Sequence, residues 1–273
     1  MRTRALALAA AGSLTMASIT VAAAPAFAAD SSAQLSVLHA VPGLTVDVYV
    51  NGKLTLDNFK PGTLAGPLEL AGGTYEVAIT AADAKDDSDP AIGPVDLKLA
   101  DGGNYTAVAH LKENGDPTAA LFTNDVSKTD AGQGRITVRH VAAAPAVDVL
   151  AGGDAAVTDL SNPDEEVLNL DAGTVSAAVA ATGSTDPLIG PADVAVKEGV
   201  NTIVYAWGSL DDDNLKLAVQ TIPGLHSGPG GVNAGQVGLA ADRSPLPFLA
   251  AGGALLAGLL VAARRRSPAR SGR

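Results

Sequence analysis

The chain has 273 residues, of which 47% are apolar and only 3% aromatic, and it contains no cysteine. This apolar content excludes a disordered polar chain, and the lack of cysteine excludes a disulfide-stapled scaffold, a thiolate metal site and a thiol nucleophile. A formal net charge of −11 argues against nucleic acid as a partner, because nucleic-acid-binding faces are basic.

The N-terminal segment, residues 1–28, has the three parts of a secretory signal peptide. Arg2 and Arg4 precede an apolar stretch rich in Ala and Leu, and this stretch ends in Ala26-Phe27-Ala28. A basic start, an apolar middle and an Ala-x-Ala end predict export, with cleavage after Ala28.

Two similar units follow, at 29–125 and 135–222, and a polar linker at 126–134 joins them. The first unit contains a run from His39 through Asp47, and a similar run in the second unit contains His140 and Asp148. Two further matches occur in the same order along the chain, Leu68–Thr74 with Leu168–Thr174, and Asp89–Pro94 with Asp186–Pro191. Matches in a conserved order indicate a tandem duplication.

Apolar residues alternate with other residues within each unit, as in Val46, Val48 and Val50. This period of two predicts half-buried strands, about seven per unit, separated by Gly, Pro and Asn turns. Loops are expected at Ala81–Ser88 and over part of Asn51–Pro67, where the two units differ in length. The fold class is therefore all-β, with two tandem immunoglobulin-like β-sandwiches, and a small barrel is the alternative.

The run His39-Ala-Val-Pro-Gly-Leu-Thr-Val-Asp47-Val-Tyr-Val-Asn-Gly52 resembles the signature of the domain-of-unknown-function family numbered 4397. The resemblance extends to both units, although the second departs more, with Ala143 and Ala144 in place of Pro-Gly. It implies a β-sandwich-like architecture and an exported, cell-surface location. It implies no activity.

The C-terminal part has the composition of a stalk followed by an anchor. Residues 223–245 are rich in Gly and Pro and form a flexible stalk, and residues 246–263 are uncharged and long enough for one transmembrane helix. Arg264, Arg265 and Arg266 follow at once, which predicts a stop-transfer signal and a cytoplasmic basic tail at 264–273. The lipid bilayer is thus an expected partner. Covalent attachment to the cell wall lacks support, because the candidate segments near the apolar span, 239–243 and 245–248, lack the Thr-Gly pair of sortase substrates.

The repeated histidines and aspartates are expected to be structural. His39 and His140 share a strand face with core residues, so each ring N–H is expected to bond a turn carbonyl. Asp47 and Asp148 lie on the opposite face and are expected to accept a turn N–H. Weak candidates for a calcium site occupy two acidic loops, Asp83, Asp86, Asp87 and Asp89 in one and Asp211, Asp212 and Asp213 in the other.

Aromatic residues give little support for a sugar-binding site. The single Trp207 shares its strand face with core positions, whereas Tyr49 points away from the neighbouring valines and is expected on the surface.

The sequence contains no catalytic motif of the common hydrolase, metalloprotease or nucleotide-binding kinds. We therefore expect a non-enzymatic, single-pass membrane protein of the cell surface, without a cofactor. Its two β-sandwich domains would serve adhesion, scaffolding or the capture of a cell-wall or extracellular ligand. The alternative is a calcium-binding or small-ligand-binding module that uses the acidic loops.

Overall fold

The computed structural model describes residues 32–227, and within this range it contains sixteen β-strands and no helix. The predicted signal peptide, the stalk beyond residue 227, the transmembrane segment and the basic tail lie outside the described residues. Among residues 32–227, no helix long and apolar enough to cross a membrane is found.

Each copy of the repeat supplies eight strands. The first copy consists of β1 (Ala33–His39), β2 (Val46–Val50), β3 (Lys53–Phe59), β4 (Leu64–Leu70), β5 (Gly73–Ala81), β6 (Ile92–Leu99), β7 (Asn104–Leu111) and β8 (Pro117–Thr123). The second copy consists of β9 (Gln133–Ala143), β10 (Val147–Ala151), β11 (Asp154–Leu160), β12 (Glu165–Asp171), β13 (Gly173–Ala181), β14 (Pro187–Val196), β15 (Val200–Ser209) and β16 (Lys216–Pro223).

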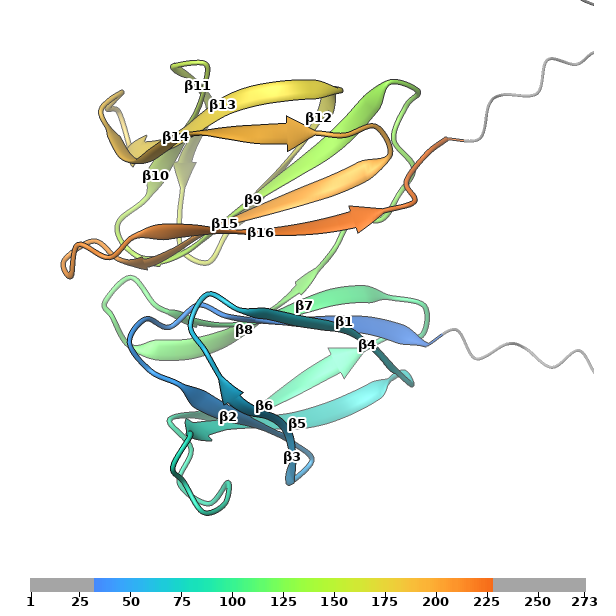
Figure 1. The fold of residues 1–273 in the computed structure, drawn as a ribbon, viewed down its shortest axis with the longest axis vertical. Coiled ribbons are helices and arrows are strands. Elements are labelled where there is room, and N and C mark those ends of the chain that lie inside the picture. Colours follow the sequence, from blue (N-terminus) through green and yellow to red (C-terminus); the bar gives the residue numbers. More distant parts are fainter. Residues whose placement is uncertain (1–31, 228–273) are drawn as a thin grey trace, which may run out of the picture. The chain divides into compact units, whose positions relative to one another are not determined.

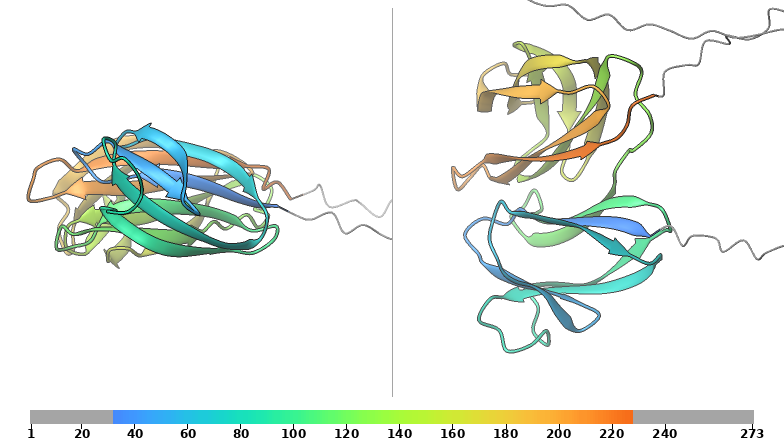
Figure 2. Two further views of the ribbon diagram at one scale, coloured as in Figure 1. Left: turned by 90° about the horizontal axis from the view of Figure 1, so that it is seen from below. Right: turned by 45° about the vertical axis from the view of Figure 1, so that its right-hand side comes forward.

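The strands form four sheets in two pairs, which confirms an all-β, sandwich-like architecture (Figures 1 and 2). In the first copy the sheets have the orders β4-β1-β7-β8 and β3-β2-β5-β6, and in the second β12-β9-β15-β16 and β11-β10-β13-β14. One pair in each copy is parallel, β1 with β7 and β9 with β15, and the other pairs are antiparallel. The two copies therefore share one topology, as the duplication requires.

The prediction of about seven strands per unit was one too low. The stretch Asn51–Pro67, part of which was assigned to loop, contains all of β3 and the beginning of β4. β4 includes Gly66 and Pro67, residues that weaken the strand signal. Proline is tolerated there because β4 is an edge strand of its sheet.

Each copy buries its own apolar side chains between its two sheets. One cluster lies wholly in the second copy and includes Ile136, Val149 and Val204. The first copy has a cluster around Leu35 and Leu97 and another around Val46 and Ile79; from the second copy, only Ala143 joins the latter. Separate burial in the two copies is thus confirmed. Residues 32–227 thus have hydrophobic interiors of their own, which is what a segment needs in order to fold by itself.

The central strands β1, β7, β9 and β15 are buried on both faces, so the prediction of half-buried strands was wrong for them. The reason is a further apolar cluster that joins the two copies. It contains Leu38, Ala40, Val108 and Phe122 from the first copy and Val141, Ile203, Tyr205 and Trp207 from the second. Trp207 is buried, as expected from its strand face, but against the other copy rather than between its own sheets.

Arg139 of β9 is at the centre of a buried polar network between the copies and is 0% exposed. Its guanidinium donates to Glu165 Oε2 at 2.7 Å, to the Tyr205 hydroxyl at 2.8 Å and to Asn124 Oδ1 at 3.0 Å. It also lies over the Phe122 ring, 4.3 Å from the ring centroid. The Gln220 side-chain oxygen extends the network, because it accepts hydrogen bonds from Tyr205 at 2.6 Å and, across the interface, from Thr106 of β7 at 3.0 Å.

The segment that joins the copies is packed along the second copy. Arg135 forms an ion pair with Asp125 at 2.9 Å and donates to the carbonyl of Ser127 at 3.1 Å. Lys128 Nζ donates to the carbonyl of Gly224 at 3.0 Å. These contacts and the apolar cluster fix the two copies against each other.

Candidate functional site

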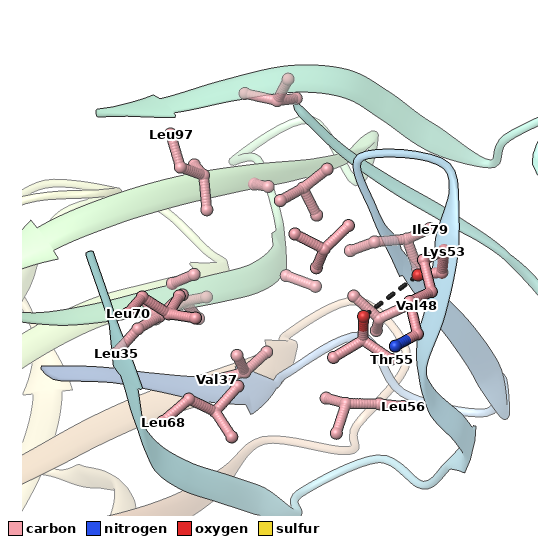
Figure 3. Close-up of a pocket in the computed structure, with 17 residues that line it drawn as sticks. Leu35, Val37, Val48, Lys53, Thr55, Leu56, Leu68, Leu70, Ile79 and Leu97 are labelled. Atoms are coloured by element: carbon pink, nitrogen blue, oxygen red, sulfur yellow. Dashed lines mark hydrogen bonds between the residues drawn. The ribbon is translucent and has the colours of Figure 1, made fainter. Parts of the chain in front are cut away.

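An apolar cavity of about 210 Å³ lies between the two sheets of the first copy. Figure 3 shows Leu35, Val37, Leu68 and Leu70 on the side of β1 and β4, facing residues of β2, β3 and β5 across the cavity. The only polar side chains in its lining are those of Lys53 and Thr55, both on the edge strand β3.

A second cavity, also of about 210 Å³, occupies the equivalent place in the second copy. The equivalent of the Leu35–Val37 wall is formed by Ile136 and Val138 of β9, and the equivalent of Leu68 and Leu70 by Leu168 and Leu170 of β12. Every residue in this lining is apolar. We call the two spaces the first and second cavity.

The two cavities have the same volume although their linings differ. The second copy has the larger side chain at two positions, Val204 where the first has Ala107 and Leu217 where the first has Ala119. The first copy has the larger side chain at five others, listed here with their equivalents: Val50 (Ala151), Thr55 (Ala156), Val77 (Ala177), Ile79 (Val179) and Leu97 (Val194). Gains at some positions are thus offset by losses at others, and the space between the sheets is retained.

The packing of the edge strands explains why a space remains between the two sheets. In the first copy β6 and β8 pack against each other along one side of the sandwich. Along the other side lie the edge strands β3 and β4, whose residues are mostly exposed or half-buried. The space between the sheets is therefore closed on the side of β6 and β8, and Lys53 and Thr55 of the edge strand β3 line it on the other side.

The signature histidines lie away from the cavities and bond to turns. His39 Nε2 lies 2.7 Å from the carbonyl oxygen of Leu44, and His140 Nε2 lies 3.0 Å from that of Pro145. Both rings are 1% exposed, and the His39 ring stacks on Phe59 with centroids 5.9 Å apart. Burial lowers the pKa of both histidines below the ordinary value, although the carbonyl contacts partly oppose this shift. Each ring is therefore neutral at pH 7 and donates its N–H to a turn.

The signature aspartates hold a bend in the neighbouring strand. Asp47 accepts the backbone N–H of Asn58 at 2.7 Å, and Asp148 accepts that of Asp159 at 2.9 Å. Asn58 and Asp159 both have left-handed backbone angles, with φ of 53° and 60°. Asp148 also accepts the N–H of Gly183 at 2.8 Å, and these backbone hydrogen bonds lower the pKa of its carboxyl group.

Within residues 32–227, no group of three or more His, Cys, Asp or Glu side chains is placed to hold a metal ion, in the acidic loops or elsewhere. In the first loop, Asp86 caps its own turn by accepting the N–H and hydroxyl of Ser88 at 3.1 and 2.5 Å, and the pKa of Asp86 is lowered as a result. In the second loop, the Asp212 N–H donates to Ser209 Oγ at 3.2 Å. The hydrogen bonds of Asp86 with Ser88 and of Asp212 with Ser209 do not include the other acidic residues of the loops, which are Asp83, Asp87, Asp89, Asp211 and Asp213.

Tyr49 is not the surface aromatic that its strand face predicted, since it is only 9% exposed. Burial, together with the nearby carboxylates of Asp47 and Asp87, raises the pKa of its hydroxyl group.

The alternation that predicts half-buried strands does not predict the two cavities. Alternation of apolar residues identifies side chains that face between the sheets, but it carries no information on how closely the sheets approach. The one available signal was the compensation between copies, in which Ala107 and Ala119 are small where Val204 and Leu217 are large.

Part of the chain is similar to a known protein family. Residues 33–150 match the model of DUF4397, a domain of unknown function. The resemblance inferred from the His39 run is thereby confirmed over this range. The DUF4397 match covers the whole first copy and continues through β9 into β10, so it includes both signature runs. No curated protein matches the chain.

Proposed function

We propose that this chain is a non-enzymatic, exported and membrane-anchored surface protein whose two immunoglobulin-like β-sandwiches capture small apolar ligands. The signal peptide expected at 1–28 and the apolar segment at 246–263, followed by Arg264–Arg266, support the location. The recurrence of one cavity in both copies, at the same volume with different lining residues, carries the functional proposal.

The size of the cavities supports ligand capture. A space of 210 Å³ that no side chain fills costs about 5 kcal/mol at roughly 24 cal/mol per Å³. That cost is large beside the stability of a typical domain, about 5–15 kcal/mol. An apolar ligand that enters the space regains part of this free energy by burying its surface and by making dispersion contacts with the lining.

No observation favours adhesion or calcium binding in the same way. Within the described residues, no group of three or more His, Cys, Asp or Glu side chains is placed to hold a metal ion, and the sheet faces that join the copies bury their aromatic side chains. Capture between the sheets uses a feature that both copies possess.

Calorimetric titration of the fragment 32–227 with 1-octanol tests the proposal. We expect two sites per chain with dissociation constants on the order of 0.1–1 mM, given the affinity per atom usual for small ligands. The pair Ala107→Val and Ala119→Leu introduces side chains that the second copy already accommodates and should remove one site. The pair Ala151→Val and Ala177→Val should remove the other.

Ala155→Val is the matched control, because Ala155 lies beside the cavity residue Ala156 on β11 and is exposed. This variant should retain both sites. Octanol binding that is absent from the parent fragment, or that persists unchanged in the variant carrying all four cavity substitutions, would refute ligand capture.

A further inference from the structure

The rims of the two cavities differ in charge. The first cavity is lined in part by Lys53 and Thr55, at the beginning of β3. The strand register places Asp154 and Ala156 at the equivalent positions of β11, since Val50 pairs with Lys53 where Ala151 pairs with Asp154. Ala156 lines the second cavity, whereas Asp154 does not.

Lys53 has the position and the freedom to bind an anion at the first cavity. Figure 3 shows its side chain beside Thr55 and Leu56, at the edge of the cluster of lining side chains. Within residues 32–227, no carboxylate lies within salt-bridge distance of Lys53. The two ion pairs found there are those of Arg135 and Arg139. Three ammonium N–H donors are therefore free to bond an acceptor, while the Thr55 hydroxyl donates to the Lys53 carbonyl at 3.0 Å.

An apolar cavity with a cation at its rim fits a molecule that is apolar along its length and anionic at one end. The protein as a whole is acidic, but at 0.15 M ionic strength charges beyond about 8 Å are largely screened, and Lys53 is the only charged residue that lines the first cavity. The volume sets the length of the apolar part. Since an apolar cavity of about 150 Å³ holds a benzene ring, 210 Å³ holds roughly eight carbon atoms.

We propose that the first cavity binds a single alkyl chain that bears an anionic head group, a carboxylate in the simplest case, and that Lys53 selects for this head group. The second cavity, with its wholly apolar lining and Asp154 at the equivalent position, binds only uncharged chains. This inference rests on the ligand capture proposed above and assigns a different ligand class to each copy.

The test isolates the first cavity and compares two head groups on the same chain. In the fragment 32–227 carrying Ala151→Val and Ala177→Val, which fill the second cavity, we expect octanoate to bind more tightly than 1-octanol at pH 7.5 and 150 mM NaCl. Lys53→Gln should weaken octanoate about three- to fivefold, as expected for one solvent-accessible ion pair, and leave 1-octanol within twofold. Lys60→Gln is the matched control, because Lys60 is exposed in the same copy and does not line the cavity.

The converse experiment uses the fragment with Ala107→Val and Ala119→Leu, in which only the second cavity remains. There 1-octanol should bind and octanoate should not. If 1-octanol binds to neither fragment, ligand capture itself is wrong. If 1-octanol binds but Lys53→Gln leaves octanoate affinity unchanged, or if octanoate binds equally to both cavities, ligand capture stands and the selection by Lys53 is wrong.

Discussion

The burial of His39 and His140 as neutral rings makes the stability of this fold depend on pH. Each ring is neutral and bonded through Nε2 to a turn carbonyl, and protonation would place a charge in a site that is 1% exposed. His110 of β7 is equally buried, and burial lowers its pKa as well, with the proximity of His140 acting in the same direction. All three therefore bind protons less readily in the folded chain than in the unfolded chain.

Stability is expected to fall on mild acidification. Because the folded pKa values lie below the unfolded value of about 6.5, the contribution of each histidine is fully present above pH 6.5 and is lost as the pH falls through the folded pKa. Between the two pKa values each histidine contributes a slope of up to about 1.4 kcal/mol per pH unit. Urea unfolding of the fragment 32–227 at pH 7.5, 6.5 and 5.5 measures the slope.

His226→Gln is the control for the loss of an imidazole as such, because His226 is exposed. His140→Gln should reduce the slope. A free energy of unfolding that stays constant from pH 7.5 to 5.5 would contradict neutral burial of the histidines.

At the scale of elements, the repeated Ile-Gly-Pro motif marks a point where two strands approach too closely for a side chain. Gly93 in β6 and Gly190 in β14 have φ angles of 97° and 94°, a region that residues with a Cβ rarely adopt. A Cβ at Gly93 would lie 2.6 Å from the carbonyl oxygen of Val77, and one at Gly190 would lie 2.9 Å from that of Ala177. In each copy the register between these two strands shifts at this point.

Replacing either glycine by alanine should lower the free energy of unfolding by more than about 2 kcal/mol, because backbone strain and backbone contact act together. Gly173→Ala is the matched control, since Gly173 begins β13 with ordinary φ and with no atom within 4 Å of the added Cβ. It should change stability by less than about 0.5 kcal/mol. Chemical denaturation compares the three variants, and equal effects of Gly93→Ala and Gly173→Ala would disprove the argument.

The sequence predicted much of this level of structure and missed some of it for physical reasons. Alternation at Val46, Val48 and Val50 identified a strand, and the matching motifs identified the duplication, because both depend on local patterns. β4 was hidden by Pro67, whose cost depends on whether the strand is at an edge. Burial of Tyr49 and of the outer face of β1 depends on segments that pack from elsewhere in the chain.

At the scale of the whole molecule, a charged group is buried at the contact between the two copies. Arg139 of the second copy bonds Asn124 of the first and stacks on its Phe122 ring, while Glu165 supplies the countercharge. Sequence patterns gave no sign of this contact, since an arginine on an alternating strand is expected to face water. The outward face of β9 is buried only because a sheet of the first copy packs against it.

Arg139→Met should destabilise the fragment by about 3 kcal/mol, because Asn124 and Tyr205 lose a buried partner and Glu165 loses its cation. The parent fragment is expected to unfold in one calorimetric transition, and the variant in two, as the copies become independent. Lys98→Met is the control, because Lys98 is exposed on β6, and it should preserve a single transition. A variant that still unfolds in one transition at an unchanged temperature would show that the network does not couple the copies.

The network also makes the repeats unequal after duplication. His39 and His140 are interchangeable in kind, but Leu38 of the first copy stands where the second has Arg139, and Phe122 stands where the second has Gln220. A chain built from two first copies would lack the guanidinium, and one built from two second copies would bring two guanidinium groups to the same contact without the Phe122 ring. The two copies have thus diverged in complementary ways, and neither copy can take the place of the other at this contact.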